Sequence, residues 1–103
     1  MMTKYRAIKT EVDGITFDSR KEAARYKELI LLEKSGVISH LELQPQYDCV
    51  VDGKKICSYR ADFRYFDEKS CVIEDVKGYK TPVYKLKKKL VEALYPGMKI
   101  VEV

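Results

Sequence analysis

Two helical segments with clear start and stop signals enclose a long stretch of strand-like sequence. In the first, Ser19 and Glu22 form a capping-box pattern, and Gly36 supplies a C-terminal stop. In the second, Thr81 is a cap, Pro82 takes the first helical position, and the helix runs to about residue 94. Because these signals define the two helices, the sequence between them must supply most of the sheet.

The sequence outside the helices is typical of strands separated by turns. Asp-Gly pairs, the strongest short hairpin signal, occur at residues 13–14 and 52–53. We expect strands on both sides of the first pair, and then at residues 37–43, 47–51, 56–66, 71–77 and 99–103. The last helix and strand allow a parallel crossover. The sequence therefore predicts one α/β domain of residues 1–103 in the order ββ-α-ββββ-α-β.

Each helix carries an apolar stripe that we expect to be buried. The stripes are Ala23, Tyr26, Leu29, Ile30 and Leu32 in the first helix, and Val83, Leu86, Leu90 and Leu94 in the second. The three cysteines are odd in number and lack metal-ligand spacing, which predicts free, buried thiols. The single histidine, His40, is expected at the surface, so any catalysis must use carboxylates and lysine.

Charge and hydropathy limit the class of protein. Among 103 residues, 20 are Lys or Arg and 16 are Asp or Glu, which gives a net charge of +4. The longest aliphatic run, residues 29–32, is too short for a membrane span, and the polar N-terminus lacks the features of a signal peptide. We therefore expect a cytoplasmic protein. Six lysines and no acidic residue lie between Lys77 and Lys89, which indicates either a phosphate-contacting surface or an ordinary solvated face.

Strand alternation predicts where the acidic residues point. Asp62 lies on the polar, arginine-flanked face of its strand, and Asp75 shares a face with Lys77 while Glu74 points the other way. Neighbouring strands would bring Asp62 close to Asp75, and two adjacent carboxylates require a proton or a cation between them. A hard divalent metal suits such oxygen ligands. The alternatives are a solvent-facing ion pair of Asp75 with Lys77, and capping as the whole role of Glu22.

The order of these residues resembles the PD-(D/E)XK nuclease superfamily. Glu22 matches its helical acid, Asp62 matches its first strand acid, and residues 75–77 match the (D/E)-x-K tripeptide. Ala61 stands where the superfamily motif has proline. Over nearly the whole chain, and most clearly at residues 12–19, 43–46 and 74–78, the sequence is similar to a small phage-encoded family of endonucleases and Holliday junction resolvases. The resemblance implies a restriction-endonuclease-like core, in which helices flank a central mixed sheet.

The resemblance also implies a chemistry, a cofactor and a partner. The protein would be a metal-dependent DNA endonuclease of a phage-infected bacterial host, using Mg²⁺ or Mn²⁺ and acting on branched DNA, such as a four-way junction, as a homodimer. The implied catalytic residues are Glu22, Asp62, Asp75 and Lys77, and the implied metal ligands are Glu22, Asp62, Asp75 and the carbonyl of Val76. Lys77 would orient or deprotonate the attacking water, or stabilise charge at phosphorus.

The candidate DNA contacts come from the basic segment, from the polar face of the strand at residues 56–66 and from one strand terminus. They are Lys80, Lys85, Lys87, Lys88, Arg60, Arg64 and Gln44. Lys87 falls inside the apolar arc of its helix, so it either snorkels to water or points at a ligand. Gln44 can line the cleft or serve only to begin the turn before Pro45. The alternative functions are a nuclease without branch specificity and a non-catalytic, basic nucleic-acid-binding accessory protein of a phage.

Overall fold

The computed structural model describes residues 8–68 and 70–103, and its elements follow the predicted order with one strand divided. The elements are β1 (Thr10–Val12), β2 (Ile15–Phe17), α1 (Arg20–Lys34), β3 (Ile38–Leu43), β4 (Gln46–Val51), β5 (Lys54–Arg60), β6 (Phe63–Asp67), β7 (Ser70–Asp75), α2 (Pro82–Leu94) and β8 (Ile100–Glu102). Within the described residues, neither helix is long and apolar enough to span a membrane.

The turns and helix caps form as the sequence predicts. Both residues of each Asp-Gly pair have positive φ, with values of 54° and 77° at Asp13 and Gly14, which two-residue hairpin turns of this type require. The Ser19 side chain accepts a hydrogen bond from the Glu22 backbone N–H, at 3.0 Å, and caps α1. Thr81 caps α2 in the same way. These local signals therefore define where each helix begins.

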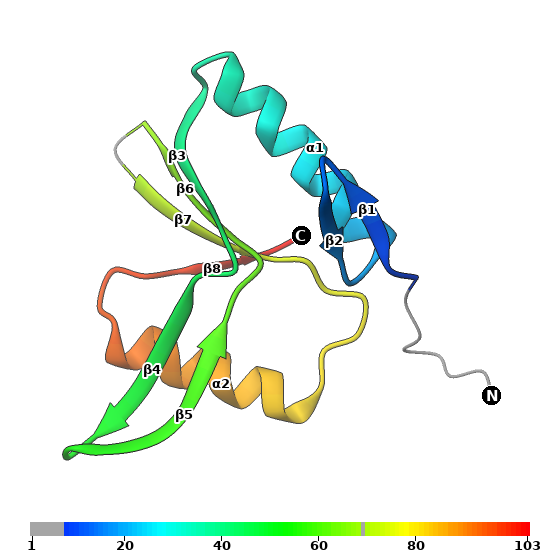
Figure 1. Cartoon of the computed structure of the whole chain (residues 1–103). Coiled ribbons are helices and arrows are strands. Elements are labelled where there is room, and N and C mark those ends of the chain that lie inside the picture. The colour runs from blue at the N-terminus through cyan, green and yellow to red at the C-terminus, as the bar shows by residue number, and fades with distance from the viewer. Residues whose placement is uncertain (1–7, 69) are drawn as a thin grey trace.

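A four-stranded mixed sheet in the order β3-β6-β7-β8 forms the centre of the molecule (Figure 1). Its first three strands are antiparallel, and β8 runs parallel to β7, which confirms the predicted crossover through α2. Helix α1 packs on one face against Phe63 and Tyr65, and α2 packs on the other against Ile73 and Ile100. The β4-β5 hairpin forms a separate two-stranded sheet beside α2.

The single strand predicted over residues 56–66 is wrong, because the chain bends at Ala61 and Asp62. β5 and β6 belong to different sheets. The chain also bends between β3 and β4, where Gln44 has a φ of 52° and Pro45 follows. Backbone hydrogen bonds join the two bends, from Gln44 N–H to the Asp62 carbonyl and from Ala61 N–H to the Pro45 carbonyl. Proline has no N–H to donate to a neighbouring strand, so regular pairing is interrupted here. The β3–β4 and β5–β6 segments therefore bend together at this point.

Three further predictions about burial and strand length need correction. Val83 and Leu86 of α2 are 62% and 67% exposed, because the helix presents Tyr84 and Val91 to the sheet instead. The three cysteines are free as predicted. Cys71 is exposed rather than buried, since it lies at the exposed start of β7. β7 also ends at residue 75 rather than 77.

Candidate functional site

The candidate site lies where β7 ends, and Asp62 is fixed there by backbone contacts. Its own N–H donates to the Glu74 carbonyl at 3.1 Å. Its Oδ2 accepts from the Val76 N–H at 2.6 Å. The bend between β5 and β6 therefore aims the Asp62 carboxylate at the last residues of β7.

Asp75 is the last residue of β7 and is 2% exposed. Its Oδ1 lies 3.0 Å from the Lys77 ammonium, and its Oδ2 accepts a hydrogen bond from the Tyr59 hydroxyl. The negative charge of Asp75 also acts on the Asp62 carboxylate, so the two acids lie near enough to affect each other's protonation. We refer to Asp62 and Asp75 as the acid pair.

Burial raises the proton affinity of the acids. Desolvation, followed by the nearby charges of Asp75 and Glu22, raises the pKa of Asp62 to about 7, although the Val76 N–H acts in the opposite direction. Desolvation also raises the pKa of Glu22, which is 5% exposed, and the charges of Asp18 and Asp75 add to the effect. Two neighbouring carboxylates repel each other when both are ionised, which favours one proton shared between them, and a cation can take the place of that proton.

The fit of this site to a divalent metal is partial. Within residues 8–68 and 70–103, no group of three or more His, Cys, Asp or Glu side chains is placed to hold one ion. The acid pair supplies hard oxygen donors with excess negative charge, which is the chemistry that Mg²⁺ requires. Lys77 and Tyr59, however, already contact both oxygens of Asp75. The acid pair and Glu22 could therefore hold a metal only if these contacts rearranged.

Lys77 is held by three elements. Its ammonium lies 4.1 Å from the centroid of the Tyr84 ring in α2, a cation–π contact. Its carbonyl accepts from the Lys21 ammonium of α1 at 3.1 Å, and its N–H donates to the Val103 carbonyl at 3.2 Å. Lys77 is thus positioned between the acid pair and α2.

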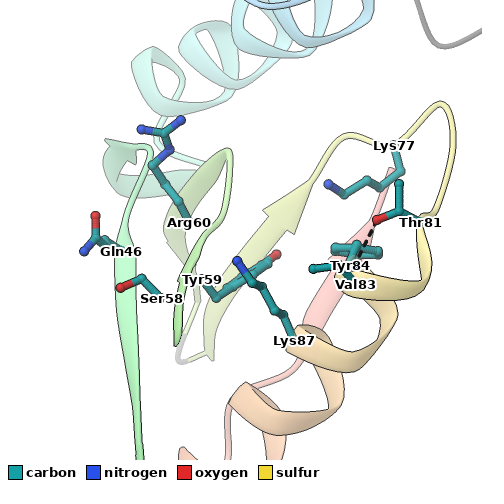
Figure 2. Close-up of a pocket in the computed structure, with 9 residues that line it drawn as sticks. All are labelled: Gln46, Ser58, Tyr59, Arg60, Lys77, Thr81, Val83, Tyr84 and Lys87. Atoms are coloured by element: carbon teal, nitrogen blue, oxygen red, sulfur yellow. Dashed lines mark hydrogen bonds between the residues drawn. The ribbon is translucent and has the colours of Figure 1, made fainter. Parts of the chain in front are cut away.

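A cavity of about 390 Å³ adjoins this lysine, between β5 and the start of α2 (Figure 2). We call it the basic pocket; its lining residues are Gln46, Ser58, Tyr59, Arg60, Lys77, Thr81, Val83, Tyr84 and Lys87. Three of these side chains are cations, and no described lining residue is acidic. Figure 2 shows Lys87 reaching from α2 toward Tyr59. The half-buried Lys87 therefore lines a cavity.

The other predicted DNA contacts lie outside the basic pocket. Lys80 pairs with Glu102 at 2.9 Å, and Lys88 pairs with Glu92 at 3.5 Å. Lys85 is exposed on α2, and Gln44 is exposed at the bend before Pro45. Arg64 donates to the Tyr47 hydroxyl, pairs with Glu42 and lines a second cavity. Of the predicted contacts, the structure brings only Arg60 and Lys87 together with Lys77.

Sequence reasoning missed the residues that support the site from other elements. Tyr59 donates to Asp75, Tyr84 holds Lys77, and Gln46 lines the basic pocket. Tyr59 fits the apolar alternation of its strand and Tyr84 lies outside the apolar stripe predicted for its helix, so the contacts of both residues follow only from the tertiary structure. Gln46 gave no signal in the sequence.

Family comparison gives one result. Over residues 2–103 the chain belongs to the family described as protein of unknown function DUF1064. A comparison with curated proteins finds no match.

Proposed function

We propose that this member of the DUF1064 family is a metal-dependent DNA endonuclease with a restriction-endonuclease-like core. The observation that carries the proposal is the acid pair, held beside Lys77 at the end of β7. The order of elements supports it as well: Glu22 lies on α1, Asp62 directly precedes β6, and residues 75–77 follow from β7, with α2 next. This is the arrangement of acids and lysine that the PD-(D/E)XK resemblance implies.

The reaction would be hydrolysis of a phosphodiester. Water forms a bond to phosphorus, and the bond from phosphorus to the 3′ oxygen breaks, which leaves a 5′-phosphate. A bound Mg²⁺ or Mn²⁺ would lower the pKa of the water and offset charge on the phosphate. Asp62, Asp75 and Glu22, with the Val76 carbonyl, would hold this ion in place of the shared proton. Lys77 supplies a positive charge at the same point, on an ammonium that Tyr84 and Asp75 already position.

The proposed substrate is branched DNA, cut by a homodimer with one site per subunit. A twofold dimer presents two identical sites, which suits the two matching strands of a four-way junction. Light scattering in solution, with and without a junction, measures the number of subunits directly.

A second candidate is a non-catalytic nucleic-acid-binding protein. The observation that favours it is that the basic pocket is lined by three cations, while Asp75 is buried and both of its carboxylate oxygens have protein partners. In that case the acids would serve only to hold the bend and Lys77 in place.

Cleavage assays separate these functions. The substrates are a labelled four-way junction, the matched duplex and a single strand, each with Mg²⁺, Mn²⁺ or EDTA. We expect metal-dependent cleavage by the wild type, and loss of cleavage in Asp75→Asn and Lys77→Ala but not in Lys27→Ala, which removes an exposed lysine of α1. Circular dichroism must show that each variant is folded. Equal cleavage of all three substrates would reject the branch preference, and binding without any cleavage would favour the second candidate.

A further inference from the structure

We infer that the basic pocket binds a phosphate of the nucleic acid other than the one that is cleaved, and that Lys87 is its anchor. The inference rests on the proposed function only in taking DNA as the ligand. The pocket is adjacent to the reaction centre but distinct from it, because neither member of the acid pair is among its described lining residues. Lys77 lies between them, since it lines the pocket and pairs with Asp75.

The charge of the pocket requires an anion. Lys87 is half-buried, and among the residues that the structure describes no carboxylate lies within ion-pair distance of its ammonium. Arg60, at the same cavity, is exposed to solvent and also has no ion-pair partner within the described part of the chain. A partly desolvated cation is costly unless an anion compensates it. A half-buried lysine without an ion-pair partner, beside two further cations in one cavity, therefore favours a ligand with negative charge.

The shape and chemistry of the lining favour a phosphate over a base. The two aromatic side chains, Tyr59 and Tyr84, are 3% and 7% exposed, so neither offers an open ring for stacking. Their hydroxyls already donate to Asp75 and Glu102. Thr81 accepts from the Tyr84 N–H, which leaves its hydroxyl hydrogen available to an anion.

A phosphate contact of this kind is independent of sequence. Phosphate contacts fix the position of a nucleic acid without reading its bases. Lys77 both lines the pocket and contacts Asp75, so a phosphate held in the pocket would position the neighbouring scissile phosphate at the acid pair. The pocket thus acts as a positioning site whose binding does not need the metal.

The test measures binding of a single-stranded oligonucleotide of mixed sequence by fluorescence anisotropy, in EDTA, over a series of salt concentrations. We expect Lys87→Ala to weaken binding several-fold and to reduce the slope of log K against log salt by about one. Lys27→Ala, which removes an exposed lysine of α1 outside the basic segment, should leave the slope unchanged and is the matched control. Circular dichroism and urea unfolding must show that both variants keep the fold.

Each outcome decides the inference separately from the nuclease proposal. Equal slopes for wild type and Lys87→Ala would overturn it, even if the wild type cleaves DNA. A lowered slope would support it, even if no DNA is cleaved. Titration with inorganic phosphate distinguishes the source of the anion: if phosphate alone saturates the pocket and Lys87→Ala leaves DNA binding unchanged, the pocket is a site for small anions and the inference is wrong.

Discussion

The raised pKa of Asp62 predicts an unusual dependence of stability on pH. An ordinary aspartate has a pKa of 3.8, whereas that of Asp62 in the folded protein is raised to about 7. Between these values the folded state holds a proton that the unfolded state has released. The free energy of unfolding therefore falls as the pH rises through this window, and the stabilisation is fully present only below about pH 4.

The size of the effect follows from the shift. About three pKa units correspond to about 4 kcal/mol at 1.36 kcal/mol per unit. Asp62 keeps some contact with solvent, so screening reduces the expected change to about 2 kcal/mol. Asp62→Asn removes the titration but keeps an oxygen that can accept from the Val76 N–H and an amide that can donate to Asp75. We expect this variant to match the wild type at pH 4.5 and to exceed its stability by about 2 kcal/mol at pH 7.5.

Urea unfolding followed by circular dichroism, in EDTA at pH 4.5, 6.0 and 7.5, measures this difference. Glu22 has a raised pKa in both proteins, so a smaller slope of the same sign should persist in Asp62→Asn. Mg²⁺ supplies a second readout at pH 7.5, because an ion at ten times its dissociation constant stabilises the wild type by about 1.4 kcal/mol. Parallel stability curves for wild type and variant between pH 4.5 and 7.5 would refute the account of a shared proton.

Three further substitutions test the packing and the site. Arg25→Leu leaves the 1% exposed Glu74 carboxylate without its guanidinium partner, and we expect the free energy of unfolding to fall by about 3–5 kcal/mol; a loss below about 1 kcal/mol in urea would contradict this. Val91→Ala should cost about 2 kcal/mol and Leu86→Ala less than about 0.5 kcal/mol, and the reverse order in the same assay would show that the apolar pattern, not the observed burial, is correct. Tyr59→Phe removes a hydroxyl donor from the acid pair, so cleavage should slow about tenfold at unchanged DNA affinity, and weaker binding at an unchanged rate would argue against this role.

The sequence predicts the local structure well because its signals act over a few residues. A capping side chain such as Ser19 contacts a backbone group three residues away, and the Asp13-Gly14 turn needs only two residues with positive φ. The bend at Ala61 and Asp62 is different. It depends on backbone hydrogen bonds to residues 44 and 45, which are distant in sequence, so no pattern within residues 56–66 indicates it.

The same distinction applies to the candidate site. Alternation along β7 correctly places Asp75 with Lys77 and points Glu74 to the opposite face, since period two is a property of any strand. The sequence does not indicate which side of α2 is exposed to solvent. The helix has a continuous apolar stripe, but Tyr84 bonds to Glu102 on β8, and this contact is part of what presents another face to the sheet.

The two buried acids at the end of β7 lie in different electrostatic environments. Glu74 and Asp75 are consecutive and equally buried, at 1% and 2% exposed. Glu74 receives two hydrogen bonds from Arg25, at 2.8 and 2.6 Å, and one from the Tyr65 hydroxyl, so its charge is fully compensated by groups that do not titrate near neutral pH. Asp75 instead faces a second carboxylate, and one lysine cannot neutralise both. A proton or a cation can complete the balance on that side of the sheet, and an exchangeable cation at this position is what the proposed phosphodiester hydrolysis would use.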